Sequence, residues 1–94
     1  MEPIGRQHGR NKEGTWYHVL SFITGEAVTI FDDGIWNYDD CMTFDAWRAG
    51  GFFKDEHGKT YVTESSGKRP PAVVYDALRD LEYDVVEPKN KMKS

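Results

Sequence analysis

Three short segments rich in β-branched and aromatic residues follow one another closely in the first half of the chain: residues 15–23, 27–31 and 35–38. The turns between them, Thr24-Gly25-Glu26 and Asp32-Asp33-Gly34, are so short that they can join strands only in antiparallel pairs. The Asp-Gly step of the second turn is typical of a tight hairpin, whose central residues need positive φ. This half of the chain is therefore predicted to form an antiparallel meander of short strands.

Two helices are predicted in the remainder of the chain. Residues 71–82 carry an apolar stripe with helical spacing, and Pro71 suits the first helical turn because its missing N–H is not needed there. The residues of this stripe are Val74, Ala77, Leu78 and Leu81. A shorter helix is predicted near residues 44–49, because the Thr43 hydroxyl can cap its start and Gly50 can end it.

The other segments of this half are predicted to extend the sheet. Residues 52–54 and 59–63 are aromatic or β-branched on either side of a polar turn that contains Gly58, which favours a further hairpin. Residues 83–86 are predicted to form a last short strand, which ends at Pro88 because proline lacks the N–H that a strand ladder needs.

These elements predict an α+β fold with a mostly antiparallel sheet of about five to six short strands. The main helix, about residues 71–82, is expected to pack on one face of this sheet, with the short helix near residues 44–49. A chain of 94 residues has room for one domain and one compact core. We expect a flexible N-terminal arm over residues 1–14, a single domain over residues 15–87 and a basic disordered tail over residues 88–94.

Composition favours a cytoplasmic protein. The chain has one cysteine, Cys41, so it can form no intrachain disulfide, whereas small secreted domains usually carry several. The first fourteen residues lack the apolar stretch of a signal peptide, and no apolar run approaches the length of a membrane span. We therefore expect a reducing compartment and no membrane partner.

Motifs for nucleophilic or phosphate chemistry are incomplete in this sequence. Gly58-Lys59-Thr60 matches the end of a P-loop, but Phe53 stands where that motif needs its first glycine. Cys41 follows Asp40, and a neighbouring carboxylate disfavours the thiolate that a nucleophile needs. Two carboxylate pairs, Asp32-Asp33 and Asp39-Asp40, leave a small enzyme with an unrecognised carboxylate pair open as an alternative.

Metal motifs are incomplete as well. The stretch DDGIWNYDD lacks the alternating acids and the final glutamate of a calcium loop. The three histidines, His8, His18 and His57, do not approach Cys41 with the spacing of zinc ligands. We therefore predict no metal, no cofactor and no catalytic residue, and the chain is interpreted as a non-enzyme.

An acidic, aromatic middle is the main functional signal. Residues 24–64 contain nine acidic side chains and three basic ones, with aromatic residues between the acids. Aromatic anchors within a polar rim are typical of protein interfaces, although acids at turns also occur simply as solvated residues. The predicted partner-binding residues are Asp32, Asp33, Trp36, Tyr38, Asp39, Asp40, Asp45, Trp47, Asp55 and Glu56.

This pattern predicts a small protein-binding domain that docks on a basic site of a larger protein. Acidic side chains speed the encounter with a basic partner, and such a site is often a nucleic-acid-binding groove. The domain would then act as a nucleic-acid mimic, as phage-type inhibitors of host proteins do. A nucleic-acid-associated domain with an aromatic sheet and basic ends is the alternative, although net charge −4 disfavours direct nucleic-acid binding. An exposed sheet edge could also support a homodimer. The basic residues at the ends are Arg6, Arg10, Lys12, Lys89, Lys91 and Lys93.

Overall fold

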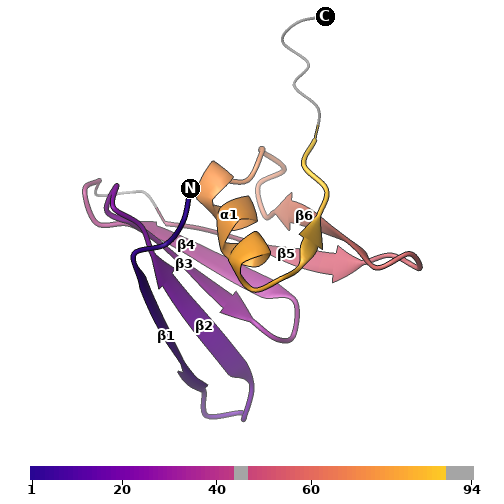
Figure 1. Ribbon diagram of the computed structural model, residues 1–94, viewed down its shortest axis with the longest axis horizontal. Coiled ribbons are helices and arrows are strands. Elements are labelled where there is room, and N and C mark those ends of the chain that lie inside the picture. Colours follow the sequence, from indigo (N-terminus) through magenta and orange to yellow (C-terminus); the bar gives the residue numbers. More distant parts are fainter. Residues whose placement is uncertain (44–46, 89–94) are drawn as a thin grey trace, which may run out of the picture.

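The computed structural model describes residues 1–43 and 47–88, which form one sheet of seven strands in sequence order. The strands are β1 (Gly5–Arg10), β2 (Trp16–Ser21), β3 (Glu26–Phe31), β4 (Ile35–Asp40), β5 (Arg48–Lys54), β6 (Lys59–Glu64) and β7 (Asp84–Val85). Neighbours from β1 to β6 pair antiparallel, and β7 pairs parallel with β6. The sheet curls into a half-barrel, and helix α1 (Ala72–Asp80) lies on its concave side (Figure 1).

The predicted α+β architecture is wrong. The sheet has seven strands rather than five or six, it is mixed because of β7, and it curls. Helix α1 has nine residues, shorter than the predicted span of residues 71–82, and it is not a main helix covering one face. A nine-residue helix is about 13 Å long, whereas seven adjacent strands span about 30 Å. The sheet must therefore enclose much of the core by its own curvature.

Two predicted segments differ in the structure. Residues 5–10 lie in strand β1, so this part of the predicted arm over residues 1–14 is paired, with His8 opposite His18. The predicted helix near residues 44–49 is wrong at its end, because Arg48 and Ala49 belong to β5 and pair with β4. Residues 44–46 and 89–94, which carry the rest of that helix and most of the predicted tail, lie outside the described residues.

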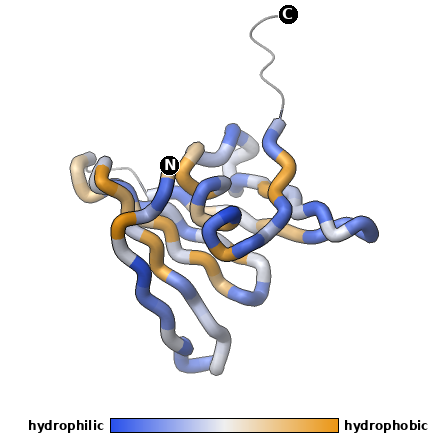
Figure 2. Tube along the Cα trace, viewed as in Figure 1, coloured by the Kyte–Doolittle hydropathy of each residue, from blue (hydrophilic) through white to orange (hydrophobic). Residues whose placement is uncertain are grey.

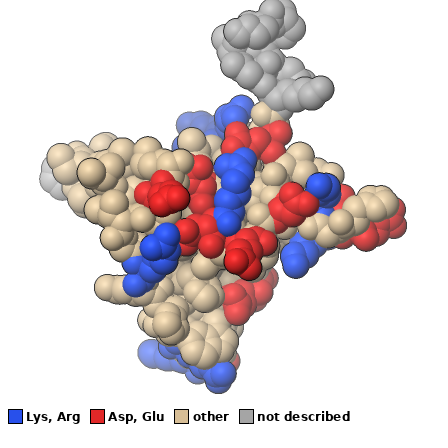
Figure 3. All heavy atoms as spheres, viewed as in Figure 1, with Lys and Arg blue, Asp and Glu red and all other residues tan. Residues whose placement is uncertain are grey.

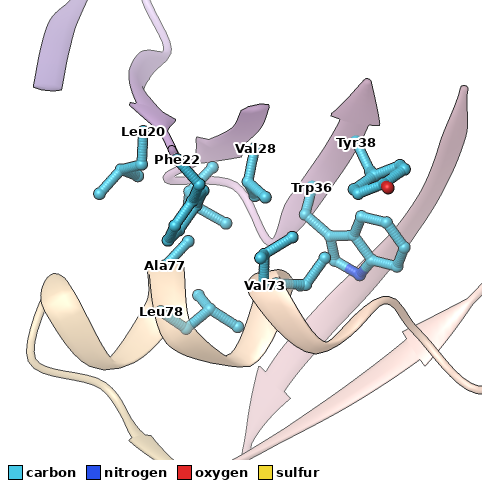
Figure 4. Close-up of a cluster of buried hydrophobic side chains, with 10 residues drawn as sticks. Leu20, Phe22, Val28, Trp36, Tyr38, Val73, Ala77 and Leu78 are labelled. Carbon is cyan, nitrogen blue, oxygen red and sulfur yellow. The ribbon is translucent and has the colours of Figure 1, made fainter. Parts of the chain in front are cut away.

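The core lies between the concave side of the sheet and α1. Alternate residues of β2, β3 and β4 point into it, and α1 contributes small and branched side chains (Figure 4). The fully or almost fully buried members are Leu20, Phe22, Val28, Ile30, Trp36, Tyr38, Val73, Val74, Ala77 and Leu78. Along the chain, β1 and the β5–β6 turn are mostly hydrophilic, whereas hydrophobic residues occur along β2 and β3 (Figure 2). Within the described ranges, no helix is long and apolar enough to cross a membrane.

An ion pair joins the edge strand β1 to the end of α1. The Arg6 guanidinium donates from Nε and Nη2 to the two carboxylate oxygens of Asp80, at 2.8 and 2.7 Å. This two-point contact lowers the pKa of Asp80 below its ordinary value of 3.8. Because Arg6 and Asp80 are distant in sequence, the pair ties the first strand to the last third of the chain.

This ion pair predicts an acid-side loss of stability. A carboxyl whose folded pKa is lowered stabilises the fold above its ordinary pKa, and this contribution disappears as pH falls through the folded pKa. We expect the free energy of unfolding to fall as pH drops below 3.8, and to fall less in Asp80→Asn. Urea denaturation above and below pH 3.8 measures this change in the free energy of unfolding. Asp33→Asn, which removes an exposed carboxylate, is the control. An unchanged slope in Asp80→Asn contradicts the role of this pair.

Candidate functional site

Across strands β2–β5, the side of the sheet that faces away from α1 carries almost no charge. Strand registers place alternate residues of β2–β5 on this side, and Asp39 is the only charged residue among them. We call this surface the convex face; its members are Tyr17, Val19, Ser21, Ala27, Thr29, Phe31, Ile35, Asn37, Asp39, Ala49, Gly51 and Phe53. A one-sided antiparallel sheet normally places its polar residues on the side away from the core. The convex face departs from that pattern.

Aromatic rings cross the convex face at the end nearer the Asp32-Asp33 turn. Tyr17 of β2 lies beside Phe31 of β3, with ring centroids 6.2 Å apart. Phe53 of β5 stacks on Tyr61 of β6 at 5.6 Å. Between these pairs lies Ile35, which is 45% exposed, while Phe53 is 56% exposed. The rings therefore form an exposed apolar band across several strands, held in place by the strand registers rather than by loops.

An open hollow occupies the other end of the convex face. It has a volume of about 320 Å³ and lies beside Trp47, whose side chain is 64% exposed. Its lining residues are Val19, Ala27, Thr29, Asn37, Tyr38, Asp39 and Trp47. Three predicted partner-binding residues, Tyr38, Asp39 and Trp47, thus line this hollow.

Trp36 and Tyr38, two of the predicted anchors, are core residues. Trp36 is fully buried, and its indole N–H donates to the backbone carbonyls of Thr63 at 3.0 Å and Gly51 at 3.2 Å. The Tyr38 hydroxyl donates to a Glu26 carboxylate oxygen at 2.7 Å, and burial together with this bond raises the pKa of Tyr38. Their prediction as partner anchors is therefore wrong, because both side chains point to the concave side.

The predicted acids do not form one patch. Asp32-Asp33 and Asp55-Glu56 lie in turns at one end of the sheet, and Asp39-Asp40 lie at the far end of β4, about 20 Å along the strand direction. Acidic and basic side chains also alternate on the side of the molecule that carries α1 (Figure 3). Asp45 lies outside the described residues. The acids border the convex face at its two ends instead of covering it.

Two of these acids also stabilise the turns in which they lie. The Asp55 carboxylate accepts backbone N–H groups of His57 and Lys59, both at 2.9 Å, and these bonds lower the pKa of Asp55. Asp40 accepts the backbone N–H of Met42 at 3.0 Å. Asp33 and Glu56 are exposed and are therefore better placed to meet a partner.

Sequence reasoning missed most of the aromatic band. In residues 15–23, Trp16, His18, Leu20 and Phe22 alternate on one side of the strand, and the residues between them lie on the other side. Tyr17 lies on this other side of β2, and the strand registers place Phe31 and Ile35 on the same side of the next two strands. The signal was therefore present, but it needed the pairing register to show that these side chains share one surface.

The chain matches no protein-family model, and comparisons with curated proteins and with solved structures found no match. Among residues 1–43 and 47–88, no group of three or more His, Cys, Asp or Glu side chains could hold a metal ion.

Proposed function

We propose that this chain is a non-enzymatic protein-binding domain that docks its convex face on a larger protein. The observation that supports the proposal is the near absence of charge from a solvent-facing sheet surface that carries exposed Ile35, Phe53 and Trp47. Exposed apolar surface of this kind favours association, because burying it removes apolar area from water. A single charged residue on the face, Asp39, keeps the desolvation cost of docking small.

The charge around the convex face defines the kind of partner. Interfaces combine an apolar centre with a polar rim, and here the exposed rim residues Asp33 and Glu56 are acidic. Such a rim accelerates encounter with a partner whose own apolar patch is bordered by Lys and Arg. Nucleic-acid-binding proteins have basic margins of this type, so a domain that competes with nucleic acid remains the preferred form of this proposal. Cys41 is an exposed free thiol, which suits the reducing cytoplasm.

Site-specific photo-crosslinking tests the convex face directly. A photoreactive amino acid at Phe53 is expected to capture a partner in cells, whereas the same amino acid at Ile23, 77% exposed in the β2–β3 turn, is not. With the captured partner purified, Phe53→Ser should weaken binding by about 30-fold, the effect typical of an aromatic anchor. Ile23→Ser is the matched control for loss of exposed apolar surface. Capture only of a second copy of this chain, or unchanged affinity of Phe53→Ser, would overturn the proposal.

The acidic rim is tested by association kinetics with the same partner. The double variant Asp33→Asn, Glu56→Gln removes two exposed charges and leaves the turn-forming carboxylates of Asp40 and Asp55 in place. We expect its association rate at low salt to fall severalfold with little change in the dissociation rate, because rim charges act mainly on encounter. An association rate that does not depend on salt in the wild-type protein contradicts a basic partner.

A further inference from the structure

A second surface lies on the concave side, beyond the end of α1. There the β1–β2 hairpin extends past the helix, so the helix does not cover the inner face of this hairpin (Figure 1). An open pocket of about 300 Å³ lies next to it. The pocket is lined by His18, Asp32, Lys54, Leu81, Glu82 and Tyr83. It is on the side of the sheet opposite to the convex face, because His18 pairs with the core residue Ile30.

Two cations on this surface lie over aromatic rings. The Arg10 guanidinium carbon is 4.7 Å from the centre of the Trp16 ring, and the Lys54 amine is 5.5 Å from the centre of the Tyr83 ring. Trp16 remains 38% exposed, so part of its ring faces solvent. This arrangement combines fixed positive charge with flat π-surfaces, the two features that proteins use to hold a nucleotide phosphate and its base.

Two histidines connect these cation–aromatic pairs. His8 of β1 lies opposite His18 of β2 in the register, with ring centroids 6.3 Å apart. The His8 ring is also 5.8 Å from the Trp16 ring. A continuous set of rings therefore leads from the hairpin to the pocket. We call this set the cationic groove; it consists of His8, Arg10, Trp16, His18, Lys54 and Tyr83.

Arg10 and Lys54 lie beside aromatic rings and not in ion pairs with the described carboxylates, while Asp32 and Glu82 place two acidic side chains in the adjacent pocket. Among the described lysines and arginines, five lie within 4.0 Å of a carboxylate: Arg6, Arg48, Lys59, Arg69 and Arg79. Arg10 and Lys54 have no such partner in the part of the chain that the structure describes, although the protein carries net charge −4. Lys12, in the β1–β2 turn, adds a further cation at the same end of the sheet. Basic side chains gather at this hairpin tip (Figure 3).

The acids of the pocket narrow the ligand class. Asp32 lies 3.6 Å from His18 Nε2, and Glu82 lines the same pocket. A carboxylate repels a bare anion but accepts hydrogen bonds from hydroxyl and amino groups. A ligand that fits cations, rings and carboxylates together has an anionic group, a flat ring and hydroxyl or amino donors. Nucleotides have all three.

We propose that the cationic groove binds a nucleotide, either free or as part of a single strand. The phosphate meets Lys54 and His18, the base stacks on the exposed part of Trp16, and Asp32 or Glu82 accepts hydrogen bonds from sugar or base donors. Arg10 holds the Trp16 ring in position and adds positive charge to the groove. This site is independent of the proposed protein-binding function, because none of its residues belongs to the convex face.

Nuclear magnetic resonance of the full chain tests this site, because the three tryptophan indole N–H groups report on three different places. Trp16 lies in the groove, Trp36 is buried in the core and Trp47 lies at the convex face. Titration with adenosine monophosphate at low salt is expected to shift the Trp16 indole resonance and to leave those of Trp36 and Trp47 in place. A Trp16→Phe variant assigns the resonance. No shift of the Trp16 resonance at low salt overturns the proposal.

Three further measurements complete the test. Lys54→Gln and Arg10→Gln should each weaken adenosine monophosphate binding by about tenfold, as expected for loss of a charged contact. Lys68→Gln, which removes an exposed cation from the loop between β6 and α1, should leave it unchanged. A short single-stranded oligodeoxythymidine that binds more tightly identifies a strand as the source of the nucleotide, and weaker binding identifies the free nucleotide. Inorganic phosphate that binds as tightly as either probe shows a simple anion site and contradicts the proposal.

Discussion

Trp36→Ala is expected to lower the free energy of unfolding by about 3–5 kcal/mol, the range for removing a large buried aromatic side chain. Trp36 is fully buried in the core between β4 and α1, and its indole N–H satisfies the carbonyls of Gly51 and Thr63. The substitution therefore leaves a cavity and also removes two hydrogen bonds across β5 and β6. Urea denaturation followed by circular dichroism measures the effect, because it does not rely on tryptophan fluorescence.

Trp47→Ala is the matched control for this prediction. The same atoms are removed from a side chain that is 64% exposed, so we expect a change below about 0.5 kcal/mol. The pair of variants therefore separates a core tryptophan from a surface tryptophan within one chain. Equal destabilisation by the two substitutions is the outcome that contradicts the assignment of Trp36 to the core and of Trp47 to the convex face.

Gly50→Ala is expected to destabilise the fold by about 3 kcal/mol or more, at the upper end of the range for overpacking. A Cβ at this position would lie 2.0 Å from the Thr63 carbonyl oxygen and 2.8 Å from the Glu64 Cα, both of which are backbone atoms. It would also lie 2.7 Å from the Trp36 ring. Since backbone cannot rotate aside, β5 and β6 would have to separate. Thermal and urea denaturation both measure this change.

Gly5→Ala provides the control for glycine replacement in a strand. A Cβ at Gly5 would meet only the Ser21 side chain at 3.7 Å, an ordinary contact, so we expect stability to stay within about 0.5 kcal/mol. If Gly50→Ala were as mild as Gly5→Ala, β5 and β6 could not approach as closely as the structure shows at Trp36.

The strands of the meander were largely predictable from sequence. Strands β2, β3 and β4 fall on the three β-branched and aromatic segments of the first half, and both short turns between them were identified. Helix α1 lies within the predicted residues 71–82, because its apolar stripe has a clear period. Local pattern decides these elements, since each has a face that must be buried and a turn that fixes its neighbour.

Curvature and edge pairing were not predictable in this way. Strand β1 has the sequence GRQHGR, which lacks β-forming residues, and it is held by its ladder with β2 and by the Arg6–Asp80 pair. Gly50 is required because the Trp36 ring and the Thr63 carbonyl lie where a Cβ would be, and this contact between neighbouring strands is not visible in the local sequence. Arg48 and Ala49 became strand rather than helix because pairing with β4 outweighed a weak capping signal.

The candidate sites show the same division. The sequence identifies an acidic, aromatic middle, but it does not separate core rings from surface rings. Trp36 and Phe53 are both aromatic strand residues, yet one is fully buried and the other is 56% exposed. The cationic groove joins β1 with β5 and the segment after α1, and such contacts depend on how the sheet curls.

Because the strands are ordered as in the sequence, most pairings close only short loops, and the largest entropic cost falls on the return of α1 and β7 to the sheet. From β1 to β6, every pairing joins strands that are neighbours along the chain, so each loop to be closed is short. These hairpins can form early and independently, but they bury little until the concave side is filled. The core closes only when α1 and β7 return to the sheet and Asp80 reaches Arg6. Cooperativity in this small domain therefore depends on its last twenty described residues, which convert a row of separate hairpins into one folding unit.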